Sequence, residues 1–376
     1  MAGRAVVVGG GIAGLAAAVG LGRRGWRVTV LERRSELSEI GAGLTLWPNA
    51  LRALDALGLG PTIRGIGLVE SAFGIRDSTG RWLSRTDSAA MTTRFGDGMV
   101  VLERPQLLAV LRDACTDVDI RTTADVDTVS ADGTVTTRSG DTVTGDVVIG
   151  ADGLWSTVRR KLWPDSTIRP TGALAARLIG DIGQRIGDGG ETWGQGDYAG
   201  MVPLPDGRIY AYLVVPTAAG SPTEPTEALP WWQRRFAGWH QPLPQLLANP
   251  EQLLLNELFD LAPLPSLVHG RIALVGDAGH AITPNLGQGA CQALEDAVEL
   301  AACLDPGAGA PRLDRYDERR RRRVHLLARQ SRAAGVAAGW HARPLVLARN
   351  ALVRMLPDTL LLRNFDAAVD WRPPTV

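Results

Sequence analysis

A glycine-rich turn near the N-terminus constrains the fold of this chain more than any other feature. Residues 4–8, RAVVV, are rich in β-branched side chains, which is typical of a strand buried on both faces. They lead into GGGIAG, where Gly9, Gly11 and Gly14 fit the spacing G-x-G-x-x-G, and then into a helical stretch to about residue 24. A second strand, WRVTVLE, follows. This order predicts a strand–helix–strand unit that opens an α/β fold.

The same unit predicts a dinucleotide site. Gly9 permits the tight turn, Gly11 lets a pyrophosphate approach the backbone, and Gly14 lets helix and strand pack closely. The helix N-terminus offers N–H groups and positive potential to the phosphates. Glu32 ends the second strand, where a carboxylate can accept hydrogen bonds from the adenosine ribose. Because that carboxylate disfavours a 2′-phosphate, the nucleotide is expected to be NAD or FAD.

The uncharged run of residues 5–22 also resembles a signal peptide or a short membrane helix. Gly9, Gly10, Gly11 and Gly14 interrupt it, and the strand that follows ends in an acid where a nucleotide site needs one. We therefore expect no integral membrane segment and a cytoplasmic location.

Composition restricts the other partners. Lys plus Arg and Asp plus Glu number 40 each in the 376 residues, so no global charge favours nucleic acid or an anionic membrane, and partners must be inferred from local sites. The five arginines from Arg319 to Arg323 are interpreted as a solvated helix end, because acids precede them. The three cysteines are widely spaced and the histidines scattered, so neither a disulfide nor a metal site is predicted.

Two later loops repeat the pattern of a strand, an acid and a helix. GADGLWSTVRRKL places Asp152 and Gly153 at the end of a strand. Taken alone, this loop could hold an ordinary N-capping aspartate followed by a surface arginine, Arg159. HGRIALVGDAGHAITPNLGQG places Asp277 just after a buried strand that ends at Val275.

Together the three motifs resemble those of the class A flavoprotein monooxygenases, the FAD-dependent aromatic hydroxylases of the para-hydroxybenzoate and salicylate hydroxylase type. The resemblance covers nearly the whole chain. It implies an α/β fold with a Rossmann-type FAD-binding domain, an inserted β-sheet substrate domain and C-terminal helices. The matching motifs are Gly9, Gly11 and Gly14, then Asp152-Gly153, then Gly276-Asp277 with Pro284, Gly287, Gln288 and Gly289.

We expect three parts in the chain. The FAD-binding domain is predicted to comprise residues 1–67, 101–165 and 266–305, and the substrate domain residues 68–100 and 166–265. Residues 306–376 are expected to be a helical segment whose last part, LVLARNALVRMLP, forms an amphipathic helix against the body.

The resemblance also implies which residues hold FAD. Glu32 would bind the adenosine ribose, the backbone of Val126 would lie beside the adenine, and Arg104 would reach the flavin side. Asp277 would accept hydrogen bonds from the ribityl chain, and Asp152 belongs to a motif linked with both FAD and NAD(P)H. The full predicted set is Gly9, Gly11, Ala13, Gly14, Glu32, Arg33, Gly43, Arg104, Val126, Asp152, Asp277, Pro284, Leu286, Gly287, Gln288 and Gly289.

The third loop suits a reduced flavin. Two-electron reduction leaves negative charge near N1 and the C2 oxygen, which a helix N-terminus stabilises. The helix expected to begin near Ala290 would supply it, and Gly287 and Gly289 would let the backbone approach the ring. His280 is expected to make a structural hydrogen bond within the loop.

The implied activity is hydroxylation of an aromatic or other electron-rich small molecule. The resemblance implies bound FAD, transient NADH or NADPH, and O2 that reacts through a flavin C4a-hydroperoxide in a closed, largely apolar site. Two alternatives stay open: epoxidation of an alkene on the same scaffold, and a flavin oxidase or dehydrogenase without oxygen insertion. The sequence does not indicate the oligomeric state.

The substrate candidates lie in the second insertion. Alternation in RIYAYLVVP puts Tyr210, Tyr212 and Val214 on one face of a strand, and Tyr198 lies on the strand before. Packing is one interpretation of these tyrosines. The other is that they orient an aromatic substrate or assist loss of its proton. The predicted catalytic residues are Tyr210, Tyr212 and Pro284, and the predicted substrate contacts are Arg177, Tyr198, Tyr210 and Tyr212.

Overall fold

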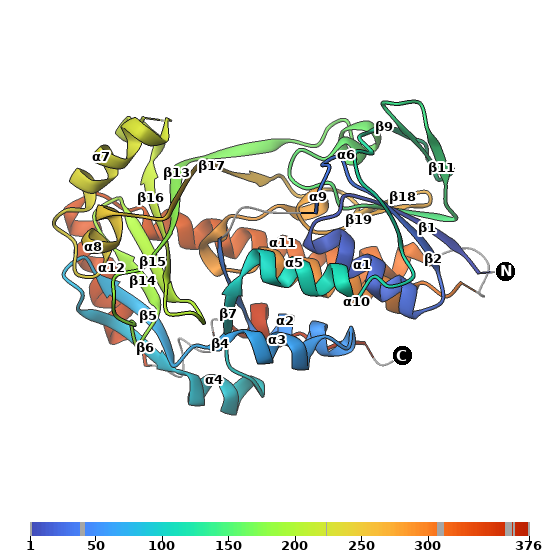
Figure 1. Cartoon of the computed structure of the whole chain (residues 1–376). Coiled ribbons are helices and arrows are strands. Elements are labelled where there is room, and N and C mark those ends of the chain that lie inside the picture. Colours follow the sequence, from blue (N-terminus) through green and yellow to red (C-terminus); the bar gives the residue numbers. More distant parts are fainter. Residues whose placement is uncertain are drawn as a thin grey trace.

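The computed structural model describes residues 2–37, 42–222, 224–306, 312–357, 363 and 365–374. It confirms the expected α/β fold. Figure 1 shows two parts: strands and helices around the N-terminus, and a larger sheet covered by helices α7 (Pro225–Phe236) and α8 (Leu243–Ala248). The long strands β13 (Ile168–Gly180) and β17 (Gln252–Leu261) connect the two parts.

The first part is built on a six-stranded sheet. Its strand order is β18-β19-β12-β1-β2-β8, and all pairs are parallel except β18 with β19. The β-branched run after Arg4 is buried, as the sequence predicts for a central strand. The strands are β1 (Arg4–Val8), β2 (Arg27–Leu31), β8 (Asp119–Arg121), β12 (Val147–Gly150), β18 (Val268–His269) and β19 (Ile272–Leu274).

Two helices that follow glycine loops pack against each other on this sheet. They are α1 (Ile12–Arg23) and α10 (Gly289–Cys303), which are far apart in the sequence. Gly20 allows the approach, because a Cβ there would lie 3.2 Å from the Cβ of Ala301. Further helices on this part are α2 (Pro48–Ala56), α3 (Gly60–Ile66), α5 (Arg104–Asp113) and α6 (Thr157–Leu162).

Two small antiparallel sheets flank the first part. The predicted meander forms one of them, with strand order β11-β10-β9, and then returns to the six-stranded sheet through β12. The other has the order β3-β7-β4. The strands are β9 (Val126–Val129), β10 (Thr134–Thr137), β11 (Thr142–Thr144), β3 (Gly43–Leu46), β4 (Leu68–Val69) and β7 (Val100–Glu103).

The second part is a seven-stranded sheet of order β17-β13-β16-β15-β14-β5-β6. The predicted alternation is confirmed on β16: Ile209, Ala211 and Leu213 pack with the aromatic residues of α7, and the tyrosines lie on the other face. The domain boundaries given above stay a prediction. The remaining strands are β5 (Ala72–Asp77), β6 (Trp82–Asp87), β14 (Gly190–Trp193), β15 (Tyr198–Pro203) and β16 (Ile209–Pro216), and helix α4 (Ser88–Phe95) follows β6.

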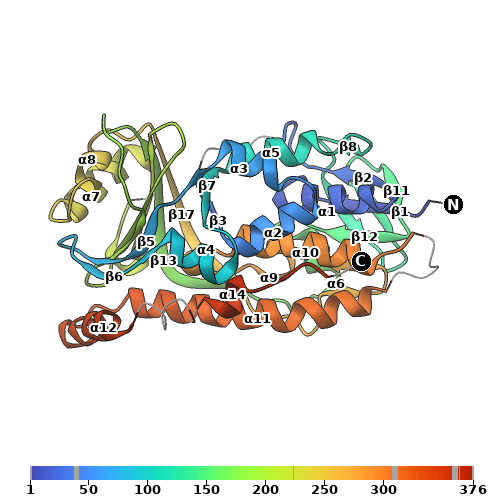
Figure 2. The same cartoon turned by 90° about the horizontal axis from the view of Figure 1, so that it is seen from below.

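The C-terminal segment is helical, as expected. Figure 2 shows α11 (Leu313–Ala338) along the length of the molecule, with α12 (Arg343–Met355) at its far end and the short α14 (Asp366–Val369) beside it. The expected packing of the last amphipathic helix against the body is confirmed on one side of α12, where Arg349 is buried, and most of its other residues are exposed. No helix in the described ranges is long and apolar enough to cross a bilayer.

Candidate active site

A cavity of about 750 Å³ is lined by the carboxyl edge of the six-stranded sheet and by the tyrosine face of the seven-stranded sheet. The structure therefore brings most of the predicted residues to one place. Gly14, Gln288 and Tyr198 are not among the lining residues. Those in the lining are Gly9, Gly11, Ala13, Glu32, Arg33, Gly43, Arg104, Val126, Asp152, Arg177, Tyr210, Tyr212, Asp277, Pro284, Leu286, Gly287 and Gly289.

The glycine loop between β1 and α1 has the geometry that a pyrophosphate needs. Gly9 has φ +107°, and a Cβ there would lie 2.4 Å from the carbonyl oxygen of Ala151. A Cβ on Gly14 would lie 1.9 Å from the carbonyl oxygen of Gly9, so this glycine serves the close packing of helix and strand. A Cβ on Gly11 would meet nothing within 4 Å, because this position faces open space. The loop is thus a cradle that fits a phosphate group at the start of α1.

Glu32 joins the end of β2 to this loop. Its Oε2 accepts a hydrogen bond from the backbone N–H of Gly10 at 2.6 Å, and its Oε1 accepts one from Arg34 at 2.9 Å. A carboxylate has further lone pairs, so it can also accept from ribose hydroxyls. Val126, at the start of β9, lines the same region of the cavity.

The second motif contains the capping aspartate that its local pattern predicts, and its link with FAD and NAD(P)H stays a prediction. Asp152 caps the start of α6, since its Oδ2 accepts from the backbone N–H of Thr157 at 2.6 Å and its Oδ1 from the hydroxyl of Ser156 at 2.5 Å. Burial raises the pKa of Asp152. The idea of a surface arginine is wrong: Arg159 is buried, and it donates a hydrogen bond to the carbonyl of Ala278 at 2.8 Å. This bond ties the second motif to the third.

The third motif forms another part of the cavity wall. Asp277 begins the short helix α9 (Asp277–His280), and its side chain is exposed in the cavity. The 3-10 turn η2 (Pro284–Leu286) and Gly287, with φ +61°, then lead into α10. A Cβ on Gly289 would meet nothing within 4 Å, so the N-terminus of α10 opens onto free space. A planar ring fits against such an end.

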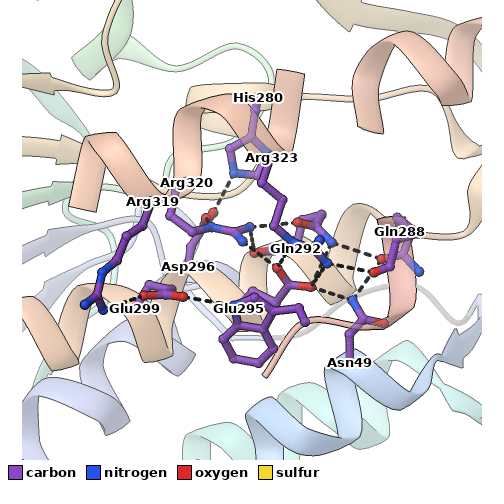
Figure 3. Close-up of polar contacts among 12 residues, drawn as sticks. Asn49, His280, Gln288, Gln292, Glu295, Asp296, Glu299, Arg319, Arg320 and Arg323 are labelled. Carbon is purple, nitrogen blue, oxygen red and sulfur yellow. Dashed lines mark hydrogen bonds and ion pairs between the residues drawn. The ribbon is translucent and has the colours of Figure 1, made fainter. Parts of the chain in front are cut away.

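A buried network of charged and polar side chains connects α10 with α2, α9 and α11 (Figure 3). Arg320 of α11 is fully buried and donates to Asp296 at 2.7 Å and to Glu295. His280 bonds the second oxygen of Asp296 at 2.5 Å. Burial alone would raise the pKa of Asp296, but His280 and Arg320 outweigh it and hold the pKa at about 2. The interpretation of the arginine run as a solvated helix end is therefore wrong for Arg320, because one side of α11 packs on α10 and brings this arginine between two carboxylates.

The same network explains why Gln288 does not line the cavity. Its Oε1 accepts a hydrogen bond from Asn49 of α2 at 3.0 Å, and Asn49 also donates to Glu295 at 2.6 Å (Figure 3). Gln288 thus fixes the turn before α10 through its side chain. Its predicted contact with FAD stays a prediction.

The substrate side of the cavity holds an acid that the sequence analysis missed. Glu191 of β14 is buried, accepts a hydrogen bond from the Tyr212 hydroxyl, and accepts another from Trp193 Nε1 at 2.9 Å. All three side chains line the cavity. Burial raises the pKa of Glu191 against the effect of these two donors. In the sequence Glu191 opens ETWGQGDY with no motif around it, and only the pairing of β14, β15 and β16 brings it to Tyr212.

The other substrate candidates lie nearby. Tyr210 and Tyr212 have ring centroids 6.3 Å apart, and Arg177 of β13 is the strand partner of Tyr212. The hydroxyl of Tyr198 accepts a hydrogen bond at 2.8 Å from Asn285, which lies in the turn before α10. Burial raises the pKa of Tyr198. Tyr198 therefore links the sheet to the third motif from just outside the cavity.

Comparisons with known proteins agree with this site. A model of the family described as FAD binding domain matches residues 3–175 and 264–331. The aurachin C monooxygenase/isomerase of Stigmatella aurantiaca is 33% identical over 93% of this chain and 94% of its own length. The 2-heptyl-3-hydroxy-4(1H)-quinolone synthase of Pseudomonas aeruginosa is 34% identical over 94% of each chain.

Solved structures show the same similarity. Klebsiella pneumoniae HpxO, crystallised with FAD and uric acid, superposes with a TM-score of 0.87 at 28% identity and covers 97% of this chain and 96% of its own. A salicylate hydroxylase substrate complex has a TM-score of 0.80 at 25% identity, over 100% of this chain and 99% of its own. The resemblance drawn from the three motifs is confirmed: this chain belongs to the FAD-binding family, as an FAD-dependent class A flavoprotein monooxygenase of the aromatic hydroxylase type.

Proposed function

We propose that this enzyme hydroxylates a heteroaromatic ring that bears an acidic N–H or O–H group and an apolar side chain, with NADH or NADPH as reductant and O2 as the oxygen source. A 2-alkyl-4(1H)-quinolone is a compound of this kind. The hydrogen bond from Tyr212 to Glu191, made inside the cavity, is the observation that carries the proposal. The name of one relative above, the 2-heptyl-3-hydroxy-4(1H)-quinolone synthase, supports the quinolone class.

The pair suits a ring that must lose a proton. While Tyr212 donates to an ionised Glu191, the lone pairs of its phenol oxygen can accept a hydrogen bond from the N–H or O–H of a substrate. As the substrate proton moves to Tyr212, the tyrosine proton moves to Glu191, so charge is conserved in each transfer. The deprotonated ring is richer in electrons and is attacked more readily by an electrophilic oxygen.

An apolar side chain has a place beside this pair. Ala175, Val202 and Val214 of the seven-stranded sheet line the cavity near the tyrosines. Val353 and Leu356, at the end of α12, add further apolar surface. Burying a hydrocarbon chain stabilises a complex by about 0.8 kcal/mol per methylene group. Such walls also exclude water from the reacting atoms.

The residues of the cofactor side fit FAD. When bound, FAD supplies the redox and oxygen-transfer chemistry. The cradle at Gly11 would hold its pyrophosphate, Asp277 its ribityl chain, and the N-terminus of α10 at Gly289 the negative charge of the reduced ring.

A substrate screen tests the proposal. Purified FAD-loaded enzyme is mixed with NADH or NADPH and with a 2-alkyl-4(1H)-quinolone, 3-hydroxybenzoate or urate. We expect the quinolone to accelerate nicotinamide oxidation most, and the product to contain one oxygen atom from isotopically labelled O2.

The alternatives give different products. An alkene epoxide would carry the new oxygen on a side-chain double bond, and oxidase or dehydrogenase activity would give loss of two hydrogens without added oxygen. Either result, or faster turnover of urate or 3-hydroxybenzoate than of any quinolone, would reject the proposed substrate class.

A further inference from the structure

The outer surface of α12 is apolar and exposed. Among its residues, Leu345, Leu347, Leu352 and Met355 have exposed fractions of 49%, 63%, 63% and 81%. Scattered surface leucines are common, but four large apolar side chains on one helix of thirteen residues are not. This helix presents a continuous apolar strip to the outside.

The exposed side of α12 combines an apolar face with a line of arginines. Leu345, Leu352 and Met355 are seven and three residues apart, so they lie on one face. Arg343 and Arg354 are eleven residues apart, about three turns, so they share a second line, which runs beside Leu347 at the edge of the apolar surface. Both are exposed, and Arg354 keeps 50% side-chain exposure although it lies 3.9 Å from Asp77.

The segment that contains α12 carries positive charge only. From residue 333 to residue 357 the sequence contains three arginines and no aspartate or glutamate. One of them, Arg349, is used inside: it donates to the carbonyls of Ala338 at 2.8 Å and Gly194 at 2.9 Å, and its guanidinium lies over the Trp193 ring. Arg349 therefore fixes one side of α12 to the body and leaves the apolar and basic sides facing outward.

We propose that α12 binds peripherally to the surface of an anionic lipid bilayer. Leu345, Leu352 and Met355 would lie in the interface, and Arg343 and Arg354 would contact lipid phosphates. Helices with an apolar strip flanked by Arg or Lys bind membrane surfaces in this way, without crossing them. Each basic residue near an anionic surface adds electrostatic attraction, which salt weakens.

A second copy of the chain suits the face less well. Thirteen residues of helix make a strip about 20 Å long and about 10 Å wide. Stable dimers bury roughly 800 Å² on each partner, which is several times the area of this strip. A two-fold contact along α12 would also bring arginines of the two copies together with no acid from the helix to offset them.

The position of α12 relates membrane binding to substrate access. Val353 and Leu356 line the cavity, so the same short segment separates the cavity from the proposed lipid surface. An amphiphilic substrate dissolved in the bilayer would then reach the site without passing through bulk water. Only this consequence depends on the substrate class proposed above, and the binding itself does not.

Vesicle flotation tests the inference with the full FAD-loaded chain, without any aromatic compound or nicotinamide. We expect the protein to float with vesicles of equal parts phosphatidylcholine and phosphatidylglycerol, and not with phosphatidylcholine alone. Raising the salt concentration should weaken binding. The double variant Leu352→Ser/Met355→Ser should bind the anionic vesicles at least tenfold more weakly.

Val69→Ser is the matched control, because Val69 is 55% exposed on β4, outside α12. It should bind vesicles like the wild type, and both variants should retain FAD. Absence of binding to the anionic vesicles would overturn the inference. So would light scattering that finds a dimer in the wild type and a monomer in the double variant, since the strip would then be a contact between copies.

Discussion

The hydroxyl of Tyr212 donates a hydrogen bond to the carboxylate of Glu191, and both residues line the cavity. Trp193 donates to the second oxygen of the same carboxylate. Because burial raises the pKa of Glu191, this acid is half-ionised at a higher pH than an ordinary glutamate. A group of this kind can control how the reaction depends on pH.

Glu191→Gln should remove an acid limb from the pH profile. In the wild type we expect kcat/KM to rise with pH as Glu191 ionises, and the variant should show a flat profile about a hundredfold lower, the usual size of a general-base effect. Stopped-flow and steady-state kinetics with the best substrate from the screen measure this.

Two further variants show whether the loss of activity comes from the proton route or from any change of an acid on this sheet. Tyr212→Phe should lose a similar factor, because the proton route passes through its hydroxyl. Glu257→Gln, which changes an exposed acid on β17 of the same sheet, should leave the profile unaltered. If kcat/KM still rises with pH in Glu191→Gln, the ionisation that controls the rate belongs to another group.

Asp277→Ala should weaken FAD binding. Its carboxylate is exposed in the cavity at the start of α9, where it can accept hydrogen bonds from ribityl hydroxyls. Losing a charged hydrogen bond costs about 1.5–3 kcal/mol, which is roughly a tenfold to hundredfold rise in Kd. Titration of apoprotein with FAD, followed by flavin fluorescence, measures it. Asp113→Ala, an exposed acid at the end of α5, should keep wild-type affinity, and equal affinities for all three proteins would exclude the ribityl role.

Local patterns predicted the cofactor side of the molecule well. The strand and the glycine loop around Gly9, the cap at Asp152 and the start of α10 each depend on residues close together in the sequence. Each of these features lies where a strand or loop leads into a helix, so the local order of residues carries the information. The alternation on β16 was predictable for the same reason.

Features that depend on distant pairing were not predictable. Glu191 meets Tyr212 only through the order of three strands, and Arg320 is buried only because α11 crosses α10. In the sequence Arg320 is one of five arginines, and no local signal separates it from its neighbours. The exposed strip of α12 has the same origin, since an apolar periodicity indicates a face without showing what covers it.

Glu70→Gln should stabilise the fold at neutral and alkaline pH. Burial, with the nearby charge of Asp188, raises the pKa of Glu70 to about 8, although the N–H of Gly189 opposes this. Since the folded-state pKa is above the ordinary value, the contribution of Glu70 to stability is complete below about pH 4.3 and is lost as the pH rises to about 8. Denaturant unfolding should find the variant more stable than the wild type by a few kcal/mol near pH 8, on the order expected for a shift of this size. The two should converge in acid, whereas Glu318→Gln, at an exposed site on α11, should match the wild type throughout.

Arg320→Ala should destabilise the protein by about 3–5 kcal/mol, because it leaves Glu295 and Asp296 buried without their main cation. Arg322→Ala provides a matched control two residues away, where the side chain is exposed, and it should change the free energy of unfolding by less than about 0.5 kcal/mol. Urea unfolding of both variants distinguishes the two interpretations of Arg320. If this part of α11 were a solvated helix end, the two variants would lose equal free energy of unfolding. Since α10 rests on this network and presents its N-terminus to the cavity, Arg320→Ala should also bind FAD more weakly, while Arg322→Ala keeps wild-type affinity.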